Sequence, residues 1–192
     1  MDIFGIFSAF GLSASAGLNA YIPLLVVALL AKFTDLIQLN KPWDSLTSWW
    51  IIGLLIVLSG IEFFADKVPG VNHVNDLIQS IVRPVAGALA FAASADVITE
   101  ISPVLSLAAG LFIAGGVNVA KSAVIRPAVS ATTGGAGNIP VSMAEDLTST
   151  VVSLLSVVVP VLIACLMVLF AAWLIWHLWN RPTRLSKKTS SK

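Results

Sequence analysis

The sequence has 192 residues, of which 57% are hydrophobic and 11% are charged, and its mean hydropathy is +0.94. Soluble domains carry about 25% charged residues, and a soluble domain of this length still exposes much of its surface, so the composition indicates a membrane protein. The formal net charge of +1 excludes an overall basic surface for nucleic acid.

Cysteine and histidine are too sparse for the usual metal sites. The single cysteine, Cys165, excludes an internal disulfide and a cysteine-based metal centre. His73 and His177 lie far apart in the sequence, so a zinc or haem centre is not expected. We therefore expect no cofactor and no metal. Because no nucleophile–base pair stands out either, we expect the protein not to be an enzyme.

The first apolar run extends over residues 3–31 and is long enough for one tilted helix or for a broken one. Its centre is a weak place for a helix. Two glycines and Pro23 loosen the backbone hydrogen-bond ladder, and Asn19 places a polar group at membrane depth.

A polar loop over residues 32–47 separates this run from a second predicted span at residues 48–64 and a third at residues 77–99. Asp76 is interpreted as the N-cap of the third span. Arg83 then falls about two turns inside the helix, where it needs a carboxylate, water or a route to the interface.

The fourth predicted span covers residues 104–124, and Lys121 and Arg126 are expected to end it. A loop over residues 128–141 follows. The sequence from Ser142 to Glu145 has the pattern of a capping box that opens the last helix.

The last apolar run, residues 147–180, carries no charged residue and is long for one span at about 1.5 Å per residue. We expect Pro160 to kink it, or part of it to lie along the interface. Residues 1–180 form a single predicted membrane domain, and residues 181–192 a disordered basic tail.

The basic tail is expected to be cytoplasmic under the positive-inside tendency. Five spans then place the polar segments around Lys67 and over residues 121–146 on the outside. Lys67, Lys121 and Arg126 would oppose the tendency there, and we attribute their retention to function or to ion pairing.

Two stretches of the sequence resemble each other. Residues 11–19 match residues 110–118 at a constant offset, and in the five-span topology the two helices run in opposite directions, as an inverted repeat requires. A weaker match of residues 76–77 with 146–147 pairs helices of the same direction. Glycine and asparagine are common in packed membrane helices, so an internal inverted repeat and a chance match both stand as interpretations.

Several motifs resemble those of a family of small multi-spanning bacterial inner-membrane proteins that is catalogued only as a domain of unknown function. The resemblance covers nearly the whole chain apart from the tail, and it implies a multi-pass protein of the bacterial inner membrane. It implies no activity. The motifs that carry it are Gly17-Leu18-Asn19-Ala20-Tyr21, Ala65-Asp66-Lys67-Val68-Pro69-Gly70, Arg83-Pro84, Lys121, Arg126, Asn138-Ile139-Pro140 and Glu145-Asp146.

The candidate site is a polar vestibule, because ionisable groups inside a membrane are costly and often mark a pathway. Charged groups that merely anchor helix ends are an equally good interpretation, and interhelical hydrogen bonding is the better one for the two central asparagines. The candidate pathway residues are Asn19, Glu62, Asp66, Lys67, Asp76, Arg83, Asn118, Lys121, Arg126, Asn138, Glu145 and Asp146.

The sequence thus predicts an all-α, polytopic membrane protein with about five transmembrane helices and with broken or re-entrant segments. We expect a small permease or channel for an ion, a small metabolite or a lipid headgroup, which forms a homo-oligomer in the lipid bilayer. The alternative is a non-catalytic accessory or scaffolding subunit of a larger membrane complex, whose charged groups dock a partner.

Overall fold

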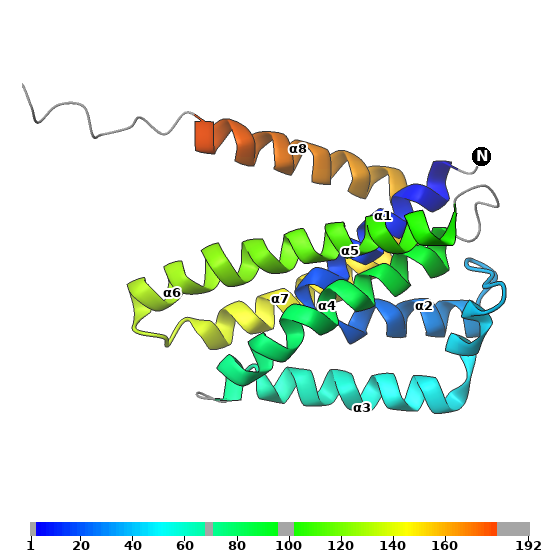
Figure 1. The fold of residues 1–192 in the computed structure, drawn as a ribbon, viewed down its shortest axis with the longest axis horizontal. Helices are drawn as coiled ribbons and strands as arrows, with labels where there is room; N and C mark the ends of the chain where they lie inside the picture. Colours follow the sequence, from blue (N-terminus) through cyan, green and yellow to red (C-terminus); the bar gives the residue numbers. More distant parts are fainter. Residues whose placement is uncertain (1–2, 68–70, 96–101, 180–192) are drawn as a thin grey trace, which may run out of the picture.

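The computed structural model describes residues 3–67, 71–95 and 102–179, and within these ranges its secondary structure is helical, which confirms the all-α part of the predicted fold class (Figure 1). The predicted tail and the Pro69-Gly70 part of the second motif lie outside the described residues. In chain order the elements are α1 (Ile3–Leu18), α2 (Tyr21–Phe33), the 3₁₀ turn η1 (Trp43–Thr47), α3 (Trp49–Ala65), α4 (Val71–Ala95), α5 (Pro103–Ala120), the π-helical segment η2 (Lys121–Ile125), α6 (Arg126–Thr133), α7 (Asn138–Val158) and α8 (Pro160–Trp179).

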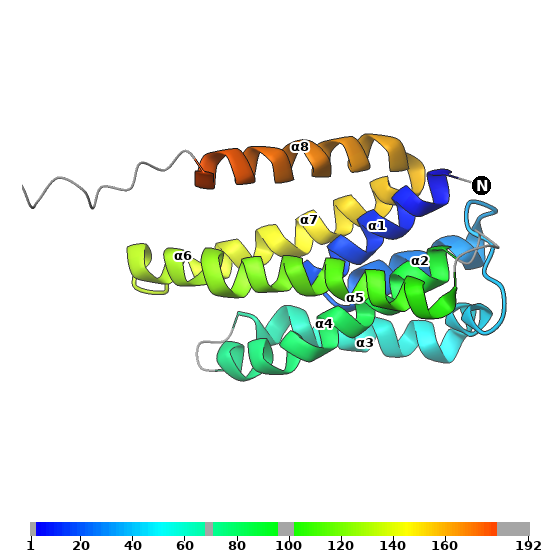
Figure 2. The ribbon, with the colours of Figure 1, turned by 45° about the horizontal axis from the view of Figure 1, so that its top comes forward.

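The helices form one elongated bundle whose axes lie roughly along its length (Figures 1 and 2). Three of them are long and apolar enough to cross a membrane: Val74–Ser94, Pro103–Thr133 and Asn138–Val158. These three helices indicate a multi-pass membrane protein. Shorter apolar helices, which include Trp49–Ala65, lie beside them.

The first apolar run is broken into two short helices. α1 has 16 residues and α2 has 13, so each is shorter than the roughly 20 residues of a span. Figure 1 shows α1 running into the bundle and α2 returning toward the end at which α1 began. The Asn19 side chain makes the break, because its Oδ1 accepts the backbone N–H groups of Tyr21 and Ile22, both at 3.1 Å, in the manner of an N-cap.

α4 begins at Val71, so the prediction that Asp76 caps the third span is wrong. Asp76 lies inside the helix, and its carboxylate binds the guanidinium of Arg126 at 2.6 Å. Arg83 consequently lies more than three turns from the start of the helix, deeper than the sequence predicted.

The helix that begins with α5 continues through η2 and α6 to Thr133, so Lys121 and Arg126 do not end it. Pro127 is accommodated because the π-helical segment η2 precedes it and changes the hydrogen-bond pattern where the proline ring would clash with a carbonyl. The predicted loop over residues 128–141 is therefore mostly helical, with a turn in which Gly134 and Gly135 take positive φ angles of 61° and 92°.

The predicted capping box at the start of the last helix is also wrong. α7 begins at Asn138, one turn before Ser142. The Glu145 carboxylate binds Lys121 and Arg126 and does not cap a backbone N–H. It belongs to a buried face of α7 that is polar throughout. Its buried residues are Ser142, Glu145, Asp146, Ser149, Ser153 and Ser156.

The last apolar run forms two helices instead of one long kinked span. α7 ends at Val158, α8 begins at Pro160, and α8 runs back along the bundle in the opposite direction (Figures 1 and 2). The end of α8 therefore lies at the same end of the bundle as the turn between α6 and α7 and the start of α4. The sequence had placed Lys67 and residues 121–146 on the side opposite the tail.

The two matching stretches lie on parallel helices, α1 and α5. Ser13 Oγ donates to the Gly110 carbonyl at 2.9 Å. Five residues farther along α1 and eleven farther along the α5 helix, Lys121 Nζ donates to the Leu18 carbonyl at 3.0 Å. Because both contacts advance in the same direction, this match is not the inverted repeat that the five-span topology predicted. The reason is that α1 enters the bundle without crossing it, which changes the direction of the later helices.

Backbones approach closely where α4 and α5 cross. A Cβ atom built on Gly110 would lie 2.5 Å from the Gly87 carbonyl oxygen and 2.7 Å from the Ala88 Cα. Only a residue without a side chain fits there, and such small-residue contacts are typical of helix packing in membranes. Gly116, six residues farther along the same helix, has no atom within 4 Å of such a Cβ.

We predict that Gly110→Ala destabilises the protein by about 1–3 kcal/mol through overpacking. Gly116→Ala is the matched control and is expected to stabilise α5 slightly, by about 0.5–1 kcal/mol, because alanine is the better helix former. The measurement is the temperature at which detergent-solubilised protein loses its folded peak in size-exclusion chromatography. Equal behaviour of the two variants would contradict the close α4–α5 contact.

Candidate functional site

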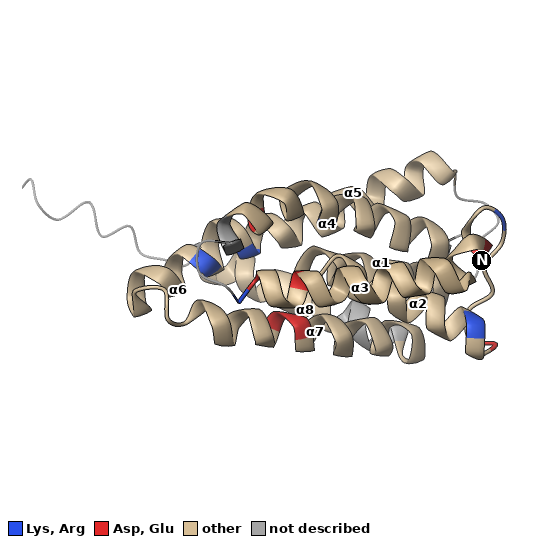
Figure 3. Ribbon diagram, turned by 90° about the horizontal axis from the view of Figure 1, so that it is seen from below, with Lys and Arg blue, Asp and Glu red and all other residues tan. Residues whose placement is uncertain are grey.

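Ionisable residues gather inside the bundle in the half that contains α6, and a separate group lies around the loop before α3 (Figure 3). We call the first group the charged cluster. Its members join the end of α3, α4, η2, α6 and α7 through ion pairs. They are Glu62, Asp66, Lys67, Asp76, Arg83, Lys121, Arg126, Glu145 and Asp146.

Arg83 lies at the centre of this cluster and is 1% exposed. Its Nε and Nη2 donate to Glu62 Oε1 at 3.2 and 3.0 Å, and Nη2 also reaches Asp66 Oδ2 at 3.5 Å. Its Nη1 donates to Asn118 Oδ1 at 3.2 Å. An arginine on α4 is thus tied to the end of α3 and to α5, and the predicted need for a carboxylate partner is met.

Arg126 binds three carboxylates from three elements. Its guanidinium contacts Asp76 Oδ2 at 2.6 Å on α4, Asp66 Oδ2 at 3.2 Å after α3, and Glu145 Oε2 at 3.2 Å on α7. The rigid fork of donors in arginine suits this multiple pairing better than the point charge of lysine. Arg126 therefore connects the ends of three helices.

Lys121 links the charged cluster to the break between α1 and α2. It is 1% exposed, and its Nζ lies 2.8 Å from Glu145 Oε2 and 3.0 Å from the Leu18 carbonyl, the last residue of α1. On the other side of the break, the Ala20 N–H donates to Glu62 Oε2 at 3.2 Å. A cation thus meets the C-terminus of α1 and an anion meets the start of α2, as the helix dipoles favour.

The Asn19 amide completes these contacts with α7. Its Nδ2 donates to Asp146 Oδ1 at 3.0 Å, and Asp146 Oδ2 binds Lys67 Nζ at 3.1 Å. The Lys67 ammonium also donates to the Phe63 carbonyl and lies 3.2 Å from the centre of the Phe63 ring. Both ends of the Asn19 side-chain amide are therefore bound, one to the Asp146 carboxylate and one to backbone N–H groups.

Eleven of the twelve predicted site residues lie in two groups of side-chain contacts that meet at the break between α1 and α2. Asn19, Lys67 and Asp146 form the smaller group. The larger group comprises Glu62, Asp66, Asp76, Arg83, Asn118, Lys121, Arg126 and Glu145. Asn138 joins neither group. It begins α7, and its side chain exchanges hydrogen bonds with Ser130 of α6 at 3.0 and 3.3 Å. Its contact holds the α6–α7 hairpin together.

The sequence analysis missed Asn75 and Ser142, which donate to the Asp66 carboxylate at 2.6 and 3.5 Å. It also missed the buried serines, in which Ser15 Oγ lies 2.8 Å from Ser149 Oγ and 2.7 Å from Ser153 Oγ. The sequence does contain a pattern that indicates the buried serines of α7. The polar residues of α7 recur at helical spacing in an apolar segment, and in a membrane the polar face of a helix is the buried one.

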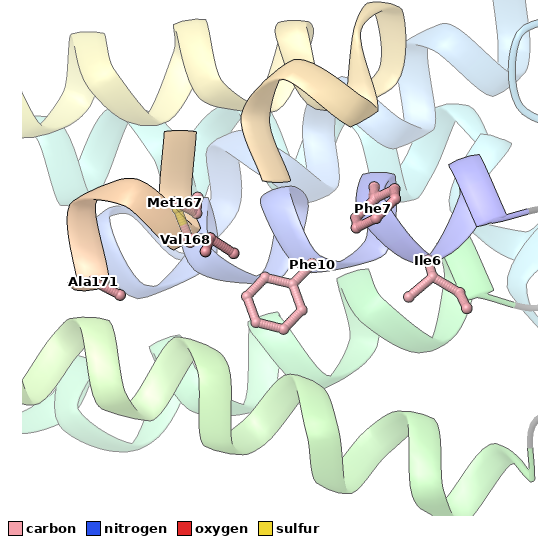
Figure 4. A pocket seen from close by; sticks show the side chains of 6 residues that line it. All are labelled: Ile6, Phe7, Phe10, Met167, Val168 and Ala171. Carbon is pink, nitrogen blue, oxygen red and sulfur yellow. The ribbon is translucent and has the colours of Figure 1, made fainter. Parts of the chain in front are cut away.

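A separate cavity of about 420 Å³ lies between α1 and α8 (Figure 4). None of the described residues that line it is ionisable, and none of them belongs to the charged cluster. It is lined by Ile6, Phe7, Phe10, Met167, Val168 and Ala171. The charged cluster is therefore the better candidate for a site that handles polar or charged molecules.

Comparison with known proteins agrees with the motifs. The family model described as Domain of unknown function (DUF4126) matches residues 6–180. The chain belongs to this family. No curated protein and no solved structure matches the chain. Membership in DUF4126 confirms the resemblance seen in the sequence, and because the family's description names no activity, we infer function from the charged cluster.

We predict that Arg83→Met destabilises the protein by about 3–5 kcal/mol, because it leaves the buried carboxylate of Glu62 without its cation. The double variant Glu62→Gln/Arg83→Met removes both charges and is expected to recover part of that loss. Unfolding of each variant in mixed detergent micelles measures the difference. A double variant no more stable than Arg83→Met would contradict the pairing.

Proposed function

We propose that this protein is a small membrane permease or channel for an ion, a small metabolite or a lipid headgroup, and that the charged cluster lines its pathway. The supporting observation is the break between α1 and α2, whose ends meet Lys121 and Glu62 inside the bundle. Broken helices that end at membrane depth and present backbone groups to charged partners are typical of ion and substrate sites in transporters.

We propose five membrane crossings, made by α3, α4, the continuous α5–α6 helix, α7 and α8, with α1–α2 as a re-entrant hairpin. The charged cluster then lies toward the side on which α8 ends (Figures 1 and 3). Placing this side in the cytoplasm of a bacterium, at its inner membrane, puts Lys67, Lys121, Arg126 and the basic tail together. That arrangement follows the positive-inside tendency, which the predicted topology opposed.

The burial of the cluster's charged side chains favours a pathway over a role in which these side chains only anchor helix ends at the membrane interface. Anchoring lysines and arginines at helix ends direct their charged groups to the interface. Glu62, Arg83 and Lys121 are instead each 1% exposed and lie within the bundle. Holding such groups there is costly, and that cost supports a functional role.

We predict that Asp66→Asn abolishes flux, because the Asp66 carboxylate binds Arg83, Arg126, Asn75 and Ser142 at once. Asp146→Asn is a milder second variant that alters the contact with Asn19. The measurement is the flux of protons, alkali cations and a panel of labelled small solutes into proteoliposomes that contain the full chain.

Asp44→Asn, an exposed site in the loop before α3, is the matched control and is expected to keep the wild-type flux. Each variant is first checked by size-exclusion chromatography for a folded peak. Unchanged flux in folded Asp66→Asn and Asp146→Asn would contradict the proposed pathway.

We further propose that the protein forms a homo-oligomer, since a chain of this size encloses little space alone. The mass of the particle in native nanodiscs is expected to be a multiple of 20.2 kDa plus lipid. A fixed hetero-complex would instead support the alternative role of an accessory subunit, in which the charged cluster stabilises a scaffold.

A further inference from the structure

We infer that the cavity between α1 and α8 binds one acyl chain of an anionic membrane phospholipid. This is a second site, separate from the charged cluster. The inference rests on the proposed function in one part only, the crossing of the membrane by α8 with its end in the cytoplasm. It holds whether or not a solute passes through the charged cluster.

The cavity offers its occupant only hydrocarbon. All six described residues that line it are apolar, and three come from α1 and three from α8 (Figure 4). A polar solute or a lipid headgroup would lose its hydrogen bonds to water there without gaining others, whereas apolar cavities stay dry and take apolar ligands. The occupant is therefore an apolar group.

The cavity opens onto the apolar outer surface of the protein. Phe10 and Val168 line it, yet they are 40% and 68% exposed. Leu166, Leu169 and Phe170 lie next to it along α8 and are exposed as well. In a membrane this surface faces the hydrocarbon of the lipids, so an acyl chain reaches the cavity from the side.

The packing of α8 explains why the cavity exists. This helix lies along the outer side of the bundle and packs mainly against α1 and to a lesser extent against α7 (Figures 1 and 2). At the cavity its side chain is that of Ala171, which fills little of the space. A bound chain would add van der Waals contacts between α1 and α8 where the side chains leave a gap.

The volume of the cavity fits a chain and not a helix. A helix is about 10 Å across with its side chains and rises about 5.4 Å per turn, so about 420 Å³ holds only about one turn of it. A methylene group is about as large as a water molecule, which takes about 30 Å³, so the same volume holds on the order of 14 methylene groups. That is most of one acyl chain.

The position of the cavity along α8 matches the depth of one leaflet. Trp176 lies near the end of α8, and tryptophan side chains there typically meet the lipid headgroups. Ala171 and Met167 precede it by five and nine residues, or about 8 and 14 Å along the helix. One leaflet contributes about 15 Å of hydrocarbon, so a chain whose headgroup lies beside the end of α8 spans the cavity.

The sequence after α8 determines the charge of the headgroup. Residues 181–192 carry five of the eleven Lys and Arg residues of the chain. Basic clusters that directly follow a membrane-spanning helix on the cytoplasmic side attract anionic lipids. An anionic phospholipid therefore complements both the apolar cavity and the basic sequence that follows α8.

Photocrosslinking of the full chain tests the site without a transported solute. The probe is phosphatidylglycerol with a diazirine near the end of one acyl chain, added in equimolar amount to the protein in mild detergent. We expect the label in residues 6–10 and 167–171, at a higher yield than on the exposed apolar face of α3, which reports non-specific lipid.

Ala171→Phe places a ring in the cavity. It is expected to reduce labelling of α1 by about tenfold or more, because the ring displaces at least two methylene groups of the chain. Leu169→Phe adds the same ring on the exposed surface, outside the lining, and is expected to label like the wild type. Ala171→Leu is a smaller replacement with the same expected direction, and each variant is first checked for a folded peak in size-exclusion chromatography.

Four results would overturn the assignment. Equal labelling of the cavity and of α3 would show that no site exists there, and wild-type labelling of folded Ala171→Phe and Ala171→Leu would place the chain elsewhere. Unchanged labelling of Ala171→Phe with loss of an oligomer would assign the cavity to a side chain of a second copy. Equal labelling by phosphatidylcholine with the same acyl chain would contradict the anionic headgroup.

The lipid site and the proposed permease fail separately. Labelling as expected, with no flux of any probe in proteoliposomes, supports the lipid site and contradicts the permease. Flux that depends on Asp66, without specific labelling of the cavity, supports the permease and overturns the lipid site.

Discussion

The rest of the structure depends on one constraint, which is that a charge placed inside the bundle needs an opposite charge within hydrogen-bond distance. Arg83 and Arg126 meet it by binding carboxylates from more than one helix. Because removing one partner strands the others, these pairs fix the relative positions of α3, α4, α6 and α7. The same pairs that make the chain viable in a membrane thus build the candidate site.

The break between α1 and α2 follows from the same constraint. A helix that stops inside an apolar bundle leaves carbonyl and N–H groups without partners, and water is not there to bind them. Lys121 binds the last carbonyl of α1, Glu62 binds the Ala20 N–H, and Asn19 caps α2. The charged cluster and Asn19 therefore supply the partners that the backbone groups at the break need.

The arrangement of polar and apolar faces fits this picture. On α7 the buried residues are serines and acids, while apolar side chains such as Leu147, Val151 and Val158 are exposed. A soluble helix has the reverse pattern. Since apolar burial contributes little to helix association in lipid, close packing at small residues such as Gly110 and interhelical hydrogen bonds carry it instead.

The sequence by itself indicated the all-helical membrane class, the family, the weak point at Asn19 and all nine residues of the charged cluster, because apolar runs and rare charges within them are local signals. It misplaced the start of α4 and the end of the α5–α6 helix, and it merged α7 with α8. At Asp76 and Ser142 the side chains do not cap a helix but form contacts across helices, an ion pair of Asp76 with Arg126 and a hydrogen bond of Ser142 with Asp66. Only the tertiary structure decided that α1 and α2 return to the same end, and hence the direction of each later helix. No sequence pattern predicts whether the chain continues in the same direction or reverses at a helix break. The partners that stabilise the reversal here are Glu62 and Lys121, which are far from the break in sequence.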